Sequence, residues 1–410
     1  MTSSDSYIYL DSNATTRPLP EVLEAMNRIM TGVWANPSSI HRAGQLARRE
    51  VDAARIEVCQ LIGASPSEII FTSGGTESVN TCIRSLARSR PQPLMITSAV
   101  EHAAVREGLD DLSEVSDHEV LILPNDSCGR VDLAALNDLI SSRADEIGFV
   151  SIMAANNETG VIQPIKEIGE ACRSAGIPFH SDATQWVGKL PLDIHEFCVD
   201  MISFAGHKFH GPKGSGVLWL REGMPLHAMV QGGGQERRRR GGTESVADIV
   251  GLGVACRAAR HWLESGGASA MEARRTQFET RIQERIPSVC INAREGDRVW
   301  STSNIGFPTV EAELMLLGLS EAGVCASAGS ACSSGALKKS SVIGAIGRQP
   351  CQASDQPYGS VRFSFDRLME PSMLDSAVDI IVEVFGRLQQ VTPGGQWPLD
   401  ACEATGTDRL

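Results

Sequence analysis

The chain has 410 residues, of which 42% are hydrophobic and 21% charged, with a formal net charge of −13. This length predicts two or three domains, or one large domain with a smaller partner, and the acidic balance argues against a general nucleic-acid binder. No apolar run approaches the length of a membrane helix and the polar N-terminus does not resemble a signal peptide, so we expect a cytoplasmic protein.

Seven short β-branched or apolar runs in the first two thirds of the chain predict strands. They are Glu68–Thr72, Leu94–Thr97, Val120–Leu123, Ile147–Met153, Ile177–His180, Asp200–Phe204 and Gly216–Leu220. Amphipathic stretches such as Lys166–Ser174 separate most of them, and this alternation predicts an α/β fold with a largely parallel sheet. The last two runs are joined by a Gly-rich loop without a helix, which favours at least one antiparallel pairing.

The pattern changes after Gly251. The predicted elements there are helices at Gly251–Glu264, Met271–Ile286, Ala312–Leu317 and Ser372–Leu388, and strands at Ser303–Phe307 and Ser360–Phe365. We therefore expect a large domain at residues 15–255 and a smaller α+β domain at residues 1–14 and 256–392. Residues 393–410 carry turn formers without a period, which predicts a poorly ordered tail.

Lysines and cysteines narrow the search for reactive side chains. Only six of the 37 basic residues are lysines, namely Lys166, Lys189, Lys208, Lys213, Lys338 and Lys339. The 11 cysteines include no C-x-x-C pair, which fits neither a disulfide framework nor a zinc site. Most of the cysteines are expected to be small buried hydrophobes.

Three motifs follow predicted strands. Phe71–Ser78 (FTSGGTES) leads from a strand through glycines into a helix, a place that favours an anion but also suits an ordinary capped turn. Asp182 closes a strand where open α/β sheets bind ligands, although an aspartate there is often only a turn former. Lys208 lies among glycines after a strand, where loss of solvent lets an amine act as a nucleophile. The pair His207 and His210 shows no third metal ligand nearby, so we predict no metal site.

Cys332 lies in the run CASAGSACSSG, whose Ser, Ala and Gly residues cannot pack a core. This composition predicts a mobile, exposed loop with an accessible thiol, whereas Cys325 follows apolar residues and is expected to be structural. Most loop cysteines have no chemical role, so composition leaves open whether Cys332 is a nucleophile.

The ordered set of motifs resembles one family. From Tyr9–Val22 (YLDSNATTRPLPEV) to Val361–Phe365 (VRFSF), the chain carries NPSSIHRAGQLAR, EHAAV, NNETGVIQPI, DATQWVGKLPLD, GHKFHGPKG, GGGQER, GTES and GSACSSG. The chain is similar to cysteine desulfurases of the class V aminotransferase group, of the nitrogen-fixation or iron–sulfur assembly type. That resemblance implies the type I pyridoxal-phosphate-dependent fold, with a mainly parallel seven-stranded sheet, a smaller α+β domain and a homodimer.

The resemblance also implies roles for individual residues. Lys208 matches the lysine that holds pyridoxal 5'-phosphate covalently, Asp182 the partner of the ring nitrogen, and His102 the imidazole stacked on the ring. Other cofactor-binding positions correspond to Gly75, Thr76, Asn157, Gln185, His207 and Thr243, the last reaching across a dimer interface. Arg362 matches the arginine that binds the substrate carboxylate, Asn36 belongs to the substrate-side segment, and Cys332 matches the nucleophile that takes sulfur as a persulfide.

The implied activity is conversion of L-cysteine to L-alanine, with sulfur passed to an acceptor or iron–sulfur scaffold protein. A related pyridoxal-phosphate lyase for selenocysteine or cysteine sulfinate is the nearest alternative, and a scaffold without catalysis is another. Ala205 departs from the family, where a serine often supplies a phosphate contact. The basic run Arg237–Arg240 is interpreted as a solvated or interface loop.

Overall fold

The computed structural model describes residues 7–328, 340–347 and 358–391. Its largest sheet has seven strands in the order β2-β8-β7-β6-β5-β3-β4. The strands are β2 (Ile69–Thr72), β3 (Leu94–Ser98), β4 (Glu119–Leu123), β5 (Ile147–Ser151), β6 (Phe179–Asp182), β7 (Met201–Ala205) and β8 (Gly216–Leu220). All pairings are parallel except those of β8 with β2 and β7. The predicted α/β class, the seven strands and the antiparallel pairing are therefore confirmed.

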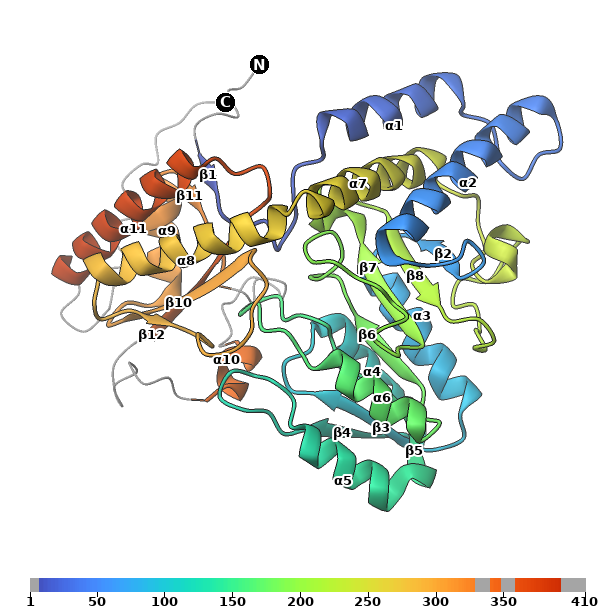
Figure 1. The fold of residues 1–410 in the computed structure, drawn as a ribbon, viewed down its shortest axis with the longest axis horizontal. Coiled ribbons are helices and arrows are strands. Elements are labelled where there is room, and N and C mark those ends of the chain that lie inside the picture. Colours follow the sequence, from blue (N-terminus) through green and yellow to red (C-terminus); the bar gives the residue numbers. More distant parts are fainter. Residues whose placement is uncertain (1–6, 329–339, 348–357, 392–410) are drawn as a thin grey trace, which may run out of the picture.

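Helices cover both faces of this sheet (Figure 1). They are α1 (Pro20–Gly32), α2 (Arg42–Ile62), α3 (Gly75–Ser89), α4 (Ala103–Val115), α5 (Leu133–Arg143), α6 (Ile165–Ser174) and α7 (Val246–Glu264). Apolar residues of α2, α5, α6 and α7 form one buried cluster with the sheet, and those of α3 and α4 form another on the opposite face. Because both faces are covered, every strand except the edge strand β4 is buried along its whole length.

A second region contains a three-stranded antiparallel sheet in the order β12-β10-β9. Its elements are α8 (Gly267–Arg285), β9 (Cys290–Ile291), β10 (Thr302–Pro308), α9 (Ala312–Glu321), β12 (Tyr358–Ser364) and α11 (Pro371–Val391). The short helix α10 (Ser341–Ala345) packs instead against Val100 and Met153 of the first region. Helices α8, α9 and α11 bury their apolar residues against this sheet in a cluster of their own. The six elements predicted after Gly251 are all present, while the proposed domain boundaries stay a prediction.

The N-terminal segment joins the second region instead of the first. β1 (Ile8–Tyr9) pairs in parallel with β11 (Val324–Cys325), and the amide of Ser364 donates to the carbonyl of Leu10 at 2.8 Å. Residues 11–16 then run toward the large sheet, where the amide of Thr16 donates to the carbonyl of His207 at 2.8 Å. The chain therefore passes between the two sheets before α1 begins (Figure 1).

Candidate active site

A cavity of about 310 Å³ gathers most of the predicted site residues. Those that line it are Gly75, Thr76, His102, Asn157, Asp182, Gln185, His207, Lys208 and Arg362. Asn36 and Thr243 do not line it, and Cys332 lies outside the described residues, as do Lys338, Lys339 and the predicted tail. The cavity lies at the carboxyl ends of β6 and β7, where open α/β sheets bind ligands.

Lys208 reaches the cavity from a short turn that follows β7. The turn, Gly206–Lys208, is a single 3-10 helix, and its first residue has no room for a side chain. A Cβ on Gly206 would lie 2.7 Å from the Ser215 hydroxyl oxygen. The Lys208 amine donates to the carbonyl oxygens of Asn13 at 2.7 Å and Ala14 at 2.9 Å. The amine is thus held at the cavity by the backbone of the N-terminal segment.

Asp182 is the last residue of β6 and is only 6% exposed. One carboxylate oxygen accepts the amide hydrogen of Thr184 at 2.9 Å. Two residues earlier on the same strand face, His180 contacts the hydroxyls of Ser151 at 2.9 Å and Ser203 at 3.0 Å. Burial lowers the pKa of His180 to about 4, so this imidazole is neutral at pH 7. The Asp182 carboxylate therefore lies next along β6 from a neutral hydrogen-bond network of His180, Ser151 and Ser203, which joins β5, β6 and β7.

The N-terminus of α3 opens into the cavity through Gly75 and Thr76. Its N-cap residue is Gly74, which supplies no side-chain hydrogen bond to the helix. A Cβ on Gly75 would lie 3.2 Å from the Thr184 hydroxyl and 3.7 Å from the Ala205 Cβ. The first backbone N–H groups of a helix are unpaired donors at the positive end of its dipole. An uncapped, close-packed helix start of this kind fits a phosphate group.

Two histidines at the cavity are neutral. His102 is the N-cap of α4, and its Nδ1 accepts the amide hydrogen of Ala104 at 3.1 Å, which places the ring proton on Nε2. Burial lowers the pKa of His102. His207 contacts the Thr15 hydroxyl through Nδ1 at 3.1 Å, and burial, reinforced by the Lys208 charge, lowers its pKa to about 4. Neither ring adds a positive charge at pH 7.

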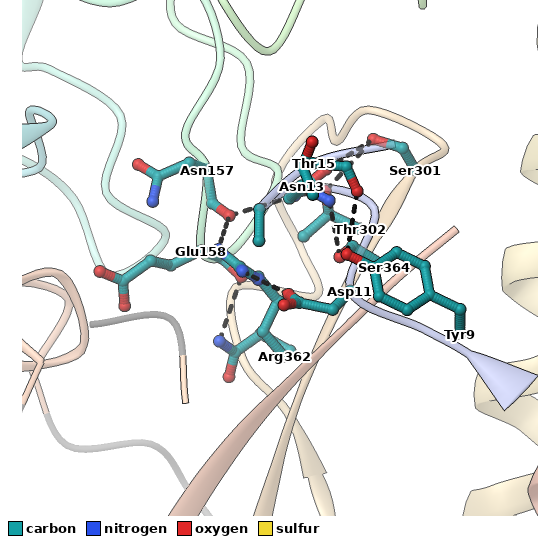
Figure 2. Close-up of polar contacts among 12 residues, drawn as sticks. Tyr9, Asp11, Asn13, Thr15, Asn157, Glu158, Ser301, Thr302, Arg362 and Ser364 are labelled. Atoms are coloured by element: carbon teal, nitrogen blue, oxygen red, sulfur yellow. Dashed lines mark hydrogen bonds and ion pairs between the residues drawn. The ribbon is translucent and has the colours of Figure 1, made fainter. Parts of the chain in front are cut away.

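Arg362 enters the cavity from β12 and is 4% exposed. Its Nη2 forms an ion pair with the Asp11 carboxylate at 2.7 Å, and its Nη1 donates to the Asn157 carbonyl at 3.0 Å. Asn13 donates to the same carbonyl at 3.1 Å, so the side chains of Arg362 and Asn13 meet at one backbone oxygen (Figure 2). The guanidinium is fixed in place and could bind a carboxylate with its remaining N–H groups.

Three residues around the cavity were missed by sequence reasoning: Asp11, Asn13 and Lys189. The Lys189 amine is buried and donates to Asn13 Oδ1 at 2.8 Å and Gln185 Oε1 at 2.5 Å, with the Ser301 hydroxyl at 3.2 Å. Burial, with the charges of Lys208 and Arg362, lowers its pKa well below the usual range. The motif YLDSNATT and the short set of lysines contain all three residues, but no pattern within either shows that distant segments meet.

Asn36 and Thr243 lie on the surface, in two segments that a single arginine connects. Arg48 forms an ion pair with Glu244 at 2.7 Å and donates to the Pro37 carbonyl at 3.4 Å. Both predicted residues are exposed. The structure therefore brings these two segments together, but away from the cavity of the same chain.

The basic run Arg237–Arg240 is less solvated than the sequence predicted. Arg240 forms an ion pair with Glu77 at 2.9 Å, and Arg239 donates to the carbonyls of Ser67 at 2.7 Å and Ile69 at 3.1 Å. Both arginines are half-buried, whereas their neighbours in the run are exposed. The interpretation as a solvated loop therefore fits Arg237 and Arg238 but not Arg239 and Arg240, whose donors are used within the chain, and the alternative of an interface loop stays a prediction.

The cysteines largely follow the expectation of burial. Among the cysteines that the structure describes, four are buried and free, namely Cys59, Cys82, Cys172 and Cys256, while Cys128, Cys198 and Cys325 are half-buried and free. Cys325 lies in β11, which fits a structural role. Cys290 is disulfide-bonded, which the odd count and irregular spacing did not predict. No helix within the described ranges is long and apolar enough to cross a membrane.

Comparisons with known proteins agree with this geometry. A model of the family "Aminotransferase class-V" matches residues 8–375. The chain is 40% identical to a cysteine desulfurase of Cereibacter sphaeroides over 95% of this chain and 98% of that relative. It is also 40% identical to "Cysteine desulfurase NifS" of Azotobacter vinelandii over 96% of each chain. A solved structure of a NifS-like protein superposes with a TM-score of 0.85 at 33% identity, covering 93% of this chain and all of the other. The chain belongs to the class V aminotransferase family.

Proposed function

We propose that this protein is a pyridoxal-phosphate-dependent L-cysteine desulfurase that releases L-alanine and keeps the sulfur as a persulfide on Cys332. The observation that carries the proposal is the cavity itself, which combines the Lys208 amine, the Asp182 carboxylate and an uncapped helix N-terminus. The two curated relatives named above, both described as cysteine desulfurases, support it.

The donor set fits pyridoxal phosphate. Lys208 would hold it covalently, Asp182 would pair with its ring nitrogen, and the start of α3 with His207 would bind its phosphate. The side chains of Gln185 and Asn157 would form hydrogen bonds with its ring hydroxyl, and His102 would stack on the ring. When bound, the cofactor supplies an electron sink for the α-carbon of an amino acid. Asp182 serves that chemistry by stabilising a proton on the ring nitrogen.

The substrate would be oriented by Arg362 and processed by two side chains. Arg362 binds the carboxylate of L-cysteine, and the freed Lys208 amine accepts the α-proton. The Cys332 thiolate then attacks the substrate sulfur, so that a sulfur–sulfur bond forms and the carbon–sulfur bond breaks. The electron pair of the broken bond returns to the carbon skeleton, which is protonated and leaves as L-alanine. Hydrolysis is not needed at any step.

We further propose that two chains assemble into a homodimer. Thr243 would contact the phosphate in the cavity of the partner subunit, and Asn36 would lie on the substrate side of a site. Both residues are exposed in the single chain and absent from its cavity. Trp34 and Ile40 on the same segment are 78% and 95% exposed, which is unusual for a surface that faces only water. The persulfide would pass to a sulfur-acceptor or iron–sulfur scaffold protein.

The decisive experiment is an assay for L-alanine with L-cysteine, with sulfide measured after addition of a thiol reductant, and mass spectrometry of the protein before the reductant is added. We expect one added sulfur on Cys332 and no turnover by Cys332→Ala, while Cys128→Ala, a half-buried free cysteine elsewhere, keeps the wild-type rate. Full activity of Cys332→Ala would overturn the persulfide mechanism.

Colour tests the cofactor separately. The wild-type protein should show the yellow absorption band of the bound cofactor, and Lys208→Ala should lose both the covalent attachment and at least about a thousandfold in rate. Lys213→Ala, which changes a lysine in the same loop, should keep the band. A colourless wild type that does not take up added pyridoxal phosphate would contradict the proposal.

A further inference from the structure

The ion pair of Arg362 and Asp11 connects two segments that are far apart in the sequence. Asp11 follows β1, and Arg362 lies in the middle of β12. Their side chains are 22% and 5% exposed, and both line the cavity. Removing the two charges of a buried ion pair from water costs free energy, which their attraction offsets only when the geometry is good. An ion pair in the wall of a cavity is therefore weak evidence for stability, and its place there suits a role in ligand binding.

The hydrogen bonds of Arg362 show what the pair does to the guanidinium. Nη2 donates to Asp11 Oδ1 at 2.7 Å and Nη1 to the Asn157 carbonyl at 3.0 Å. Nε is buried and has no partner within the part of the chain that the structure describes. Each Nη nitrogen carries a second N–H. Asp11 and Asn157 therefore fix the plane of the guanidinium and leave donors for another anion (Figure 2).

Asp11 is itself held in place. The backbone on either side of it is fixed, because Leu10 donates to the Cys325 carbonyl at 2.8 Å and Ser12 to the Ser364 carbonyl at 3.1 Å. Asn13, two residues further on, donates to the Asn157 carbonyl that Arg362 also uses. The aspartate thus approaches the arginine from a rigid segment, and a fixed carboxylate can set the orientation of a long, flexible side chain.

We propose that Asp11 is a positioning residue that makes Arg362 selective for amino acids with a free carboxylate. This inference rests on the proposed function, because it assigns Arg362 to the carboxylate of L-cysteine. Without Asp11, Arg362 would keep its charge but lose the contact that fixes its plane, and a bidentate carboxylate contact depends on that plane. Binding of the carboxylate should weaken, whereas binding of an amine without a carboxylate should not.

The test compares three variants of the cofactor-loaded enzyme. Asp11→Ala removes the support, and Asp11→Asn keeps an oxygen acceptor for Nη2 but removes the charge. Asp111→Ala is the matched control, because Asp111 forms an ion pair with Arg84 at 2.6 Å on the exposed side of α4. Equilibrium binding is followed through the absorption spectrum during titration with L-alanine and with ethylamine, and steady-state kinetics are measured with L-cysteine.

We expect Asp11→Ala to weaken L-alanine binding and to raise KM for L-cysteine by at least about tenfold. Its ethylamine binding should stay at the wild-type value and its kcat should change far less than KM. Asp11→Asn, whose neutral amide accepts a weaker hydrogen bond from Nη2 than the carboxylate does, should lie between wild type and Asp11→Ala, and Asp111→Ala should be unchanged. Melting temperature and cofactor content identify any variant that fails to fold, and Asp11→Asn then carries the test through its ratio of L-alanine to ethylamine affinity.

Two results would overturn the inference. One is an unchanged ratio of L-alanine to ethylamine affinity in Asp11→Ala, which would leave Asp11 with a structural role only. The other is tighter L-alanine binding by Asp11→Asn than by wild type, which would make Asp11 a competitor of the substrate carboxylate. Failure of the proposed function looks different, because the wild-type protein would then release no alanine from L-cysteine.

Discussion

The two sides of the cavity are built by different means. The sheet wall, formed by Gly75, Thr76, Asp182, His207 and Lys208, consists of residues at or just beyond the ends of β2, β6 and β7. The N-terminal wall, formed by Asp11, Asn13 and Arg362, joins segments about 350 positions apart. Backbone ladders of the large sheet position the first wall, whereas the second combines backbone hydrogen bonds of a short segment with side-chain hydrogen bonds.

Asn13 shows how much the N-terminal wall depends on side chains. Its amide nitrogen donates to Thr302 Oγ1 at 2.7 Å and its side-chain oxygen accepts from Lys189 at 2.8 Å. Its backbone N–H donates to Ser364 Oγ at 2.9 Å. We expect the sheet wall to tolerate loss of a single side chain better, because its strands remain paired along their length, whereas the N-terminal segment has fewer backbone hydrogen bonds.

The largest effect that separates the two walls is expected from Asn13→Ala. The change leaves the buried Lys189 amine short of an acceptor, and an unsatisfied buried polar group is costly. We expect a loss of about 3 kcal/mol in the free energy of unfolding. Ser203→Ala, which removes one hydroxyl partner of His180 within the large sheet, should cost about 1 kcal/mol. Urea unfolding monitored by circular dichroism measures both values, and equal losses would refute the contrast between the walls.

The same contrast explains which parts of the site the sequence predicts. Asp182 and Lys208 follow short apolar runs that predict strands, and the carboxyl ends of parallel strands meet at one edge. Local pattern therefore placed both residues at strand ends where ligands bind, while their roles were assigned through family resemblance. The strand containing Asp182 was predicted at Ile177–His180 and observed at Phe179–Asp182, an offset typical of element boundaries.

Local pattern could not predict the N-terminal wall. β1 and β11 have only two residues each and pair across more than 300 positions, so neither has a period that would reveal a strand. Asp11 and Lys189 carry ordinary side chains whose partners come from distant segments. Asn36 and Thr243 were assigned through family resemblance. Only the three-dimensional structure shows that neither residue lines the cavity of its own chain.

A smaller, pH-dependent effect is expected on the side of the sheet wall, at Glu101. Its carboxyl group is fully buried, with Oε1 accepting from the Ser98 hydroxyl at 2.7 Å and the Met153 amide at 2.8 Å. Burial raises the pKa of Glu101 to about 8, above its usual value of 4.5. The folded protein therefore holds a proton that the unfolded chain has lost, and stability falls as the pH rises from about 4.5 to about 8.

Glu101→Gln should remove that part of the pH dependence. Compared with the variant, the wild type should lose on the order of 1 kcal/mol or more between pH 5 and pH 8. Thermal unfolding of both proteins across this range measures the difference, and Glu107→Gln on α4 serves as an exposed control. Parallel curves for the wild type and Glu101→Gln would show that the Glu101 carboxyl group ionises without penalty in the folded state.

The smallest expected effect tests how the sheet wall binds a phosphate. Ala205 is buried at the cavity, with its Cβ facing Gly75 at the start of α3. Ala205→Ser would add a hydroxyl donor beside the backbone N–H groups of that helix.

One additional hydrogen bond from Ala205→Ser to the charged phosphate should slow loss of the cofactor by about five- to tenfold. Decay of the cofactor absorption band in the presence of a scavenger measures the rate, and Ala171→Ser on α6 should leave it unchanged. A rate equal to wild type in well-folded Ala205→Ser would mean that the phosphate lies away from α3, and the sheet wall would then have to be assigned to another part of the ligand.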